Sequence, residues 1–186
     1  VMNWNEVIEN AKGKAVKCRF CPECNGIACK GQIPGLGGKG SGSSFIRNVE
    51  KLKEVRINLD VLAENRPIDT SSTLFSYPVS LPVFIAPIAG IKNNYGAELS
   101  ESDYTEAVVK GAIDAGTLAF CGDGVNPNMF FEPVDIIQKY DGLGICTIKP
   151  WSQGGIDERI NYIKDKKIFA LASDVDAAGL PLLRNA

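Results

Sequence analysis

The sequence predicts an α/β protein built on a parallel sheet. From Val83 onward, short apolar runs alternate with segments of helical length. The apolar runs show no polar alternation, which is typical of strands buried on both faces. Glycine or proline stands near the points where the helical segments begin or end. Short connections between such elements favour parallel strands joined by helical crossovers.

Four strands and three helices are expected in this part of the chain. The first helix has an acidic first turn and Gly116 as its stop, and the second has Pro133 near its start and Gly142 beyond its end. In chain order, we predict strands at 83–87, 117–121, 143–148 and 168–176, with helices at 100–116, 132–142 and 156–167 between them.

The residues before Val83 are less regular. Residues 1–14 are typical of an amphipathic helix, and apolar side chains recur at helical spacing within 48–64. Residues 66–82 contain three prolines and indicate an extended, turn-rich segment. We therefore predict an irregular N-terminal segment at 1–48, with a helix, a cysteine cluster and a glycine-rich loop. The α/β region occupies 49–186.

The alternation fits either a doubly wound sheet or part of a (β/α)8 barrel. A complete barrel usually needs about 250 residues, and this chain has 186. The last predicted strand ends close to the last residue, and a four-stranded half barrel leaves two edges unpaired. We expect the N-terminal half, about four βα units, of a (β/α)8 barrel from a longer polypeptide. A complete small α/β domain is the alternative.

Composition excludes several classes of partner. The chain is 45% hydrophobic and 23% charged, as in globular proteins, and its net charge of -2 gives no basic field for nucleic acid or an anionic membrane. No apolar run approaches the roughly 20 residues of a membrane span. The N-terminus lacks an apolar signal core, which predicts a cytoplasmic protein. The chain contains no histidine, the usual general base near neutral pH.

Four cysteines lie within twelve residues, spaced C-x2-C-x2-C-x4-C. Four thiolates can hold a zinc ion or an iron–sulfur cluster, and the first three have ferredoxin-like spacing. Unliganded thiols are the second hypothesis, and disulfides, which do not persist in a reducing compartment, are the third. The predicted metal ligands are Cys18, Cys21, Cys24 and Cys29.

The glycine-rich stretch "GLGGKGSG" contains a formal G-x-G-x-x-G at Gly35, Gly37 and Gly40. No buried strand precedes it, so the context of a dinucleotide-binding motif is absent. A flexible loop is the favoured interpretation, and closure over a substrate is the alternative.

The block "RPIDTSSTLFSYPVSLPVFIAPIAG", Arg66 to Gly90, resembles the FMN-dependent α-hydroxy-acid oxidase and dehydrogenase family, which includes glycolate and lactate oxidases. The stretches "SFIRN", "AIDAGTLAF" and "ASDVDAAG" are similar to further family segments. The resemblance covers roughly residues 38–180 and implies a (β/α)8 barrel with FMN at the carboxyl ends of its strands. The cysteine cluster lies outside the family pattern.

The resemblance also implies site residues. The backbone of Ile88 and Ala89 should touch the flavin ring, and positions 122, 147 and 174 are where the family places polar groups on it. The expected cofactor contacts are Ile88, Ala89, Gly122, Thr147 and Asp174. Asp176 would support the site. Lys149 stands where the family often has tyrosine, and its charge would hold an anionic substrate.

Two further residues follow the predicted strands. Asp123, in "CGDG", either contacts substrate or makes a turn, and Trp151 is expected to line the mouth of the substrate site.

The implied function is FMN-dependent oxidation of a small 2-hydroxy acid of the lactate or glycolate type. No catalytic residue is expected in this chain, because the family's base belongs to the second half of the barrel. The expected partners are that remaining half, further copies of the chain in a homo-oligomer, and an electron-carrier protein if the cysteines hold an iron–sulfur cluster. The alternative is a non-catalytic, metal-binding half-barrel scaffold or interaction module.

Overall fold

The computed structural model describes residues 2–16, 18–31, 41–59, 62, 64–96 and 98–175. The chain forms two compact units. The N-terminal unit comprises Val1–Pro67 and Ile91–Glu98, and the sheet unit comprises Ile68–Gly90 and Leu99–Ala186.

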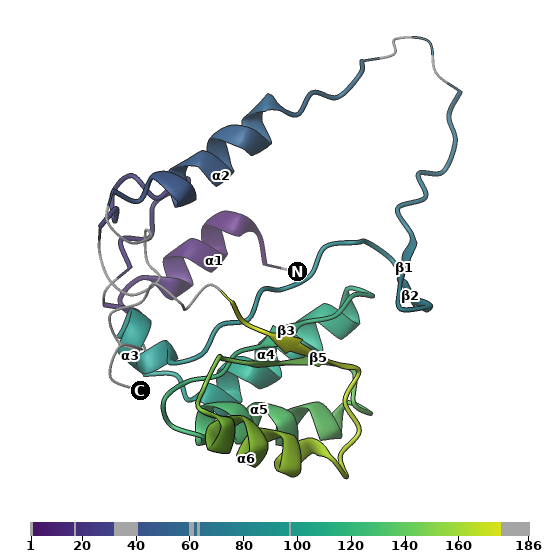
Figure 1. Ribbon diagram of the computed structural model, residues 1–186. Helices are drawn as coiled ribbons and strands as arrows, with labels where there is room; N and C mark the ends of the chain where they lie inside the picture. The colour runs from purple at the N-terminus through teal and green to yellow at the C-terminus, as the bar shows by residue number, and fades with distance from the viewer. Residues whose placement is uncertain are drawn as a thin grey trace. The chain divides into compact units, whose positions relative to one another are not determined.

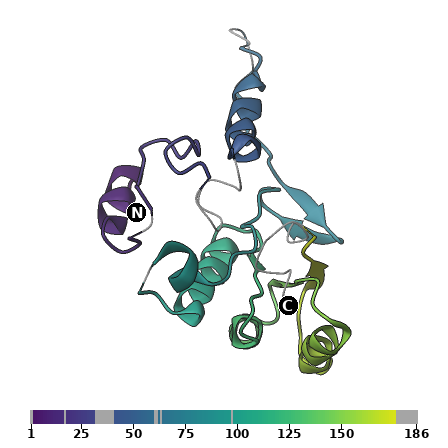
Figure 2. The ribbon, with the colours of Figure 1, turned by 60° about the vertical axis from the view of Figure 1, so that its left-hand side comes forward.

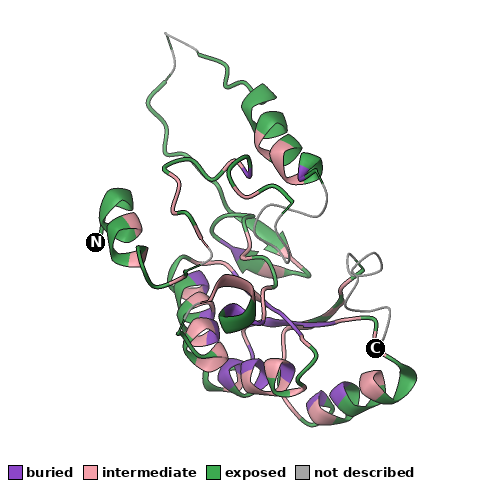
Figure 3. Cartoon of the chain, turned by 90° about the vertical axis from the view of Figure 1, so that its left-hand side faces the viewer, coloured by how far each residue is buried: buried purple, intermediate pink, exposed green. Residues whose placement is uncertain are grey.

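The N-terminal unit contains three helices, α1 (Trp4–Ala11), α2 (Ser43–Glu54) and α3 (Ile91–Tyr95). Asn3 caps α1 by accepting a hydrogen bond from the Glu6 amide, and the Glu6 side chain accepts one from the Asn3 amide in return. α2 ends at Glu54, so the helical spacing noted within 48–64 does not correspond to a helix beyond that residue. Neither α1 nor α2 has a buried residue, and most of both ribbons is coloured as exposed in Figure 3.

The sheet unit begins with a hairpin of β1 (Ser72–Leu74) and β2 (Tyr77–Val79), shown in Figure 2. Its two-residue turn places Phe75 and Ser76 at φ +48° and +66°. A turn with two positive φ values is usually made by Asn-Gly, which is why residues 66–82 gave no hairpin signal. Only extended chain and turns were predicted there.

A parallel sheet follows in the order β3 (Phe120–Cys121), β4 (Ile145–Ile148) and β5 (Ala170–Ser173). Ile85 forms a parallel bridge to Ala119, so the segment around Ile85 lies beside β3. The strand expected at 83–87 is reduced to this bridge. The α/β class with a parallel sheet is confirmed, with strands in sequential order.

Three helices accompany these strands: α4 (Glu101–Asp114) precedes β3, α5 (Asn128–Lys139) connects β3 to β4, and α6 (Gln153–Ile163) connects β4 to β5. They lie on the same side of the sheet in Figure 1. Gly116 follows α4 at φ +72° and Gly142 follows α5 at φ +77°, which confirms both as stop signals. α5 begins four residues earlier than the predicted 132, so Pro133 lies inside it.

The core of the sheet unit lies between the sheet and the helices. Its buried side chains include Val109 of α4, Phe130 and Ile137 of α5, and Cys146 of β4. All four residues of β4 are buried. No helix in the described parts of the chain combines the length and apolar character needed to cross a bilayer.

Candidate functional site

The segments that follow the parallel strands meet at one edge of the sheet. Ile148 pairs with Ser173, so β4 and β5 end level, and β3 ends at Cys121 opposite Cys146, two residues earlier. Because the strands are parallel, the residues that come next in each segment share this carboxyl edge. These residues lie at 86–90, 122–124, 149–151 and 174.

Gly122, directly after β3, lies against the backbone that joins Ile88 to Ala89. A Cβ atom at Gly122 would stand 2.6 Å from the Ile88 carbonyl carbon and 2.8 Å from the Ala89 nitrogen. Contacts this short are not tolerated between a Cβ and backbone, so only glycine fits here. The structure thus brings together three of the five predicted cofactor contacts.

Thr147, the fourth, lies in β4 one residue beyond Cys146, where β3 last pairs with β4. Its side chain is buried, and its Oγ1 has no hydrogen-bond partner among the described residues. A buried hydroxyl without a partner costs roughly 1–3 kcal/mol. Such a group at the carboxyl edge is suited to a ligand that supplies a donor or an acceptor.

Asp174, the fifth, forms an ion pair with Lys149. The Lys149 Nζ lies 2.5 Å from Asp174 Oδ2, and both side chains are mostly buried. The Asp174 amide also donates to the Ile148 carbonyl at 2.8 Å, which holds the two segments side by side. Lys149 therefore carries its charge at the predicted edge but shares it with a carboxylate.

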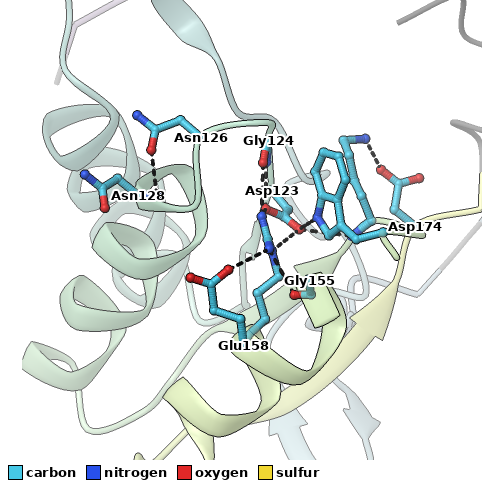
Figure 4. Close-up of polar contacts among 10 residues, drawn as sticks. Asp123, Gly124, Asn126, Asn128, Gly155, Glu158 and Asp174 are labelled. Carbon is cyan, nitrogen blue, oxygen red and sulfur yellow. Dashed lines mark hydrogen bonds and ion pairs between the residues drawn. The ribbon is translucent and has the colours of Figure 1, made fainter. Parts of the chain in front are cut away.

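Asp123 and Arg159 form a buried ion pair beneath this edge (Figure 4). Arg159 Nε lies 2.7 Å from Asp123 Oδ2, and Arg159 Nη2 lies 3.0 Å from Oδ1. The Arg159 side chain is 3% exposed and that of Asp123 is 0% exposed. Arg159 also donates to the carbonyls of Gly155 and Gly124. A bidentate pair with these extra acceptors satisfies the guanidinium on all sides.

Two further donors to Asp123 come from the segment after β4. The Lys149 amide and the Trp151 indole N–H both donate to Oδ2, at 3.2 and 2.5 Å. The Arg159 guanidinium carbon lies 5.0 Å from the centre of the Trp151 ring. Asp123 therefore holds the β3 end, the β4 end and α6 together. The sequence suggested that Asp123 either contacts substrate or makes a turn. In the structure its carboxylate is instead fully engaged in this network of hydrogen bonds.

Sequence reasoning missed Arg159. A signal was present, because Ile156, Arg159 and Ile163 recur at helical spacing, which puts the arginine on the apolar stripe of α6. A charge on such a stripe requires a buried partner, and Asp123 on the neighbouring loop is that partner.

Comparison with known families accounts for this edge of the sheet. Residues 36–181 match the model of the FMN-dependent dehydrogenases. The matched stretch includes every strand of the parallel sheet and the residues at their carboxyl ends. The chain belongs to the FMN-dependent dehydrogenase family. A search of curated proteins found no match.

The FMN-dependent dehydrogenase assignment confirms the resemblance noted in the sequence and makes FMN the cofactor of this domain. The chemistry of the edge fits a flavin, because the pyrimidine edge of the ring needs donors and acceptors from the protein. The buried Thr147 hydroxyl and the close-packed Ile88–Ala89 backbone are groups of this kind. Asp176 and the glycines at 35, 37 and 40 lie outside the described residues.

The four clustered cysteines precede the dehydrogenase match, which begins at residue 36. None of them forms a disulfide, so the disulfide hypothesis finds no support in the structure. Burial raises the pKa of Cys24, and the charges of Cys29, Cys18 and Cys21 raise it further, so the four sulfurs share one neighbourhood. Within the described ranges, no three Cys, Asp or Glu side chains are arranged as metal ligands.

The chain's other two cysteines lie within the dehydrogenase domain and belong to its core. Cys121 and Cys146 are buried neighbours on β3 and β4. Burial raises the pKa of Cys121 to about 12, and it raises that of Cys146 as well. Both thiols therefore remain protonated and pack as small apolar side chains.

Proposed function

We propose that this chain contributes to an FMN-dependent oxidoreductase that converts a small 2-hydroxy acid, of the lactate or glycolate type, to the 2-oxo acid. The substrate loses the hydrogen on its α-carbon and the proton of its hydroxyl group, and two electrons leave with them. Bound FMN supplies the electron acceptor for this step. If the cysteines hold an iron–sulfur cluster, an electron-carrier protein would then reoxidise the flavin in the cytoplasm.

The buried, unpartnered hydroxyl of Thr147 is the observation that carries this proposal. It lies at the carboxyl edge, on the strand next to the one that Gly122 follows. We assign Thr147, Gly122, and the backbone of Ile88 and Ala89 to the flavin ring. The hydroxyl would bond a polar group of the ring, and Gly122 would keep the Ile88–Ala89 backbone close to the sheet.

Lys149 is our candidate for the substrate carboxylate. Its ammonium lies at the same edge. The hydrogen bond from the Lys149 backbone N–H to Asp123 fixes the backbone, and the ion pair with Asp174 fixes the ammonium. Asp174 partly neutralises the lysine, so a substrate carboxylate would compete with it or share the charge. Asp174 itself remains a proposed flavin contact.

We further propose that the sheet is the first half of a (β/α)8 barrel. The sequential strand order and the placement of three helices on one side favour a singly wound barrel over a doubly wound sheet. The remaining half would supply the general base, since this chain has no histidine. Assembly into a homo-oligomer belongs to the same proposal.

The test is anaerobic mixing of the complete, flavin-loaded polypeptide with lactate or glycolate. We expect the flavin absorbance to bleach and the matching 2-oxo acid to form in equal amount. The matched 3-hydroxy acid should leave the flavin oxidised, because its α-carbon carries no hydroxyl. Loss of the flavin spectrum on gel filtration, or equal bleaching by both acids, would contradict the proposal.

A non-catalytic metal-binding scaffold is the second candidate. The position of four cysteines outside the dehydrogenase match favours it. A protein that binds metal but never retains FMN would support this candidate over the first.

A further inference from the structure

The cysteine loop, defined as Cys18–Cys29, has no role in the flavin domain. It connects α1 to the rest of the N-terminal unit and ends before the family match begins at residue 36. The fold of an FMN-dependent dehydrogenase therefore gives no reason for four thiols here. Their function has to be found in the unit that contains them.

The N-terminal unit has almost no apolar core. Its buried residues, among those described, are Gly26, Gly42 and Ile91. Several large apolar side chains of the unit are exposed, including Trp4, Leu52 and Val55. Units of this size with little buried apolar surface usually need a metal or cross-links to hold them together. No cross-link is present, since none of the six cysteines forms a disulfide.

The cysteine loop contacts the second helix of the unit, α2. Glu23 Oε1 lies 2.5 Å from the Lys53 ammonium on α2. A Cβ at Gly26, which has φ +77°, would lie 2.3 Å from Cδ1 of Phe45 on α2. The loop between the second and fourth cysteines is therefore pressed against both ends of this helix.

The four thiols of the loop are accessible from solvent. One of them is exposed and three are half-buried, so an ion from solvent can reach them.

We infer that Cys18, Cys21, Cys24 and Cys29 together bind one thiophilic metal centre, either a zinc ion or an iron–sulfur cluster, that holds the N-terminal unit together. Binding replaces the S–H bonds with metal–sulfur bonds and releases the thiol protons to solvent. The sulfurs have to move closer together, because they are not yet arranged as ligands. The exposed position of Cys24 gives the loop room to do so. The inference is independent of the proposed flavin chemistry.

Metal and sulfide analysis of the complete polypeptide, purified without oxygen, tests the inference. We expect either one zinc per chain, or iron with an equal amount of acid-labile sulfide. The double variant Cys18→Ser/Cys21→Ser should lose at least nine-tenths of this metal. The control Cys121→Ala, in the core of the other unit, should keep it, with FMN content recorded for every sample.

Limited proteolysis provides a second measurement on the unaltered protein. A strong chelator should raise the rate of cleavage between residues 2 and 59 at least tenfold and leave cleavage between 99 and 175 unchanged. This result needs no variant to fold. Absence of metal even after reconstitution with zinc, or with iron and sulfide, would overturn the inference. So would full metal content in the double serine variant.

Discussion

Arg159 of α6 donates two hydrogen bonds to the Asp123 carboxylate, from Nε at 2.7 Å and from Nη2 at 3.0 Å, with both side chains buried. Asp123 accepts three more, from the amides of Gly124 and Lys149 and from the Trp151 indole. The pair therefore links the two loops at the carboxyl edge to α6. The same carboxylate holds the Lys149 backbone at that edge.

Removing one partner of this pair should be costly. Asp123→Ala leaves a buried guanidinium and an indole N–H without their acceptor, so we expect the free energy of unfolding to fall by about 3–5 kcal/mol. Chemical denaturation with Trp fluorescence measures this. Asp157→Asn, on the exposed side of α6, is the control and should change stability by under about 0.5 kcal/mol. If Asp123→Ala lowers stability no more than this control does, the Asp123–Arg159 pair does not link the loops to α6.

Substitution of Gly122, compared with that of another glycine, tests the close packing of Gly122 on the Ile88–Ala89 backbone. Gly122→Ala places a methyl group 2.6 Å from the Ile88 carbonyl carbon, so we expect at least about 2 kcal/mol of destabilisation and weaker FMN binding. Gly111→Ala in α4 has nothing within 4 Å and should stabilise the protein by about 0.5–1 kcal/mol. Thermal unfolding of the two variants provides the comparison. Equal effects at both positions would argue against the close approach.

Thr147 variants test whether the buried hydroxyl serves the flavin. Thr147→Val removes an unpartnered hydroxyl, so the protein without FMN should be unchanged or slightly more stable. FMN binding should weaken by a factor of roughly 2–10, the value of one hydrogen bond. Thr147→Ser keeps the hydroxyl and should bind FMN nearly as the unaltered protein does. Flavin fluorescence titration distinguishes these cases, and unchanged affinity in the valine variant would remove Thr147 from the flavin site.

Substitutions of Lys149 and of Asp174 should change KM for the substrate in opposite directions. Asp174→Asn releases the lysine from its carboxylate, so KM for a 2-hydroxy acid should fall by a factor of roughly 2–5, as expected for a partly screened ion pair. Lys149→Met should raise KM, because the site then lacks its cation. Steady-state kinetics at two salt concentrations measures both. The lysine has no role in substrate binding if both variants shift KM in the same direction.

Thiol labelling should divide the cysteines by their surroundings. With a pKa of about 12, Cys121 has about one part in ten thousand as thiolate at pH 8, and burial also blocks access. Iodoacetamide should therefore leave Cys121 and Cys146 unmodified in the folded protein. After a chelator has removed any metal, labelling of the cysteine loop should increase as pH rises, since thiolate is the reactive form. Mass spectrometry of digested samples identifies the labelled residues, and rapid native labelling of Cys121 would contradict its place in the core.

Much of the sheet unit could be predicted from local pattern. Uninterrupted apolar runs marked β3, β4 and β5, and Gly116 and Gly142 marked where helices end, because these signals depend on residues close in sequence. The β1–β2 hairpin could not be predicted, since Phe75 and Ser76 are unusual in a turn with positive φ. α2 stopped at Glu54 although its apolar spacing continued, because periodicity alone does not show whether a helix has anything to pack against.

The sequence by itself determined the parallel α/β class, the family, and the residues at the ends of the strands. It did so because alternation and motif are properties of neighbouring residues. Only the tertiary structure decided that Asp123 is bound by Arg159, that Lys149 shares its charge with Asp174, and that the Thr147 hydroxyl is buried without a partner. These relationships join segments about 25 to 36 residues apart, and burial, which sets their energy, exists only once the helices have packed on the sheet.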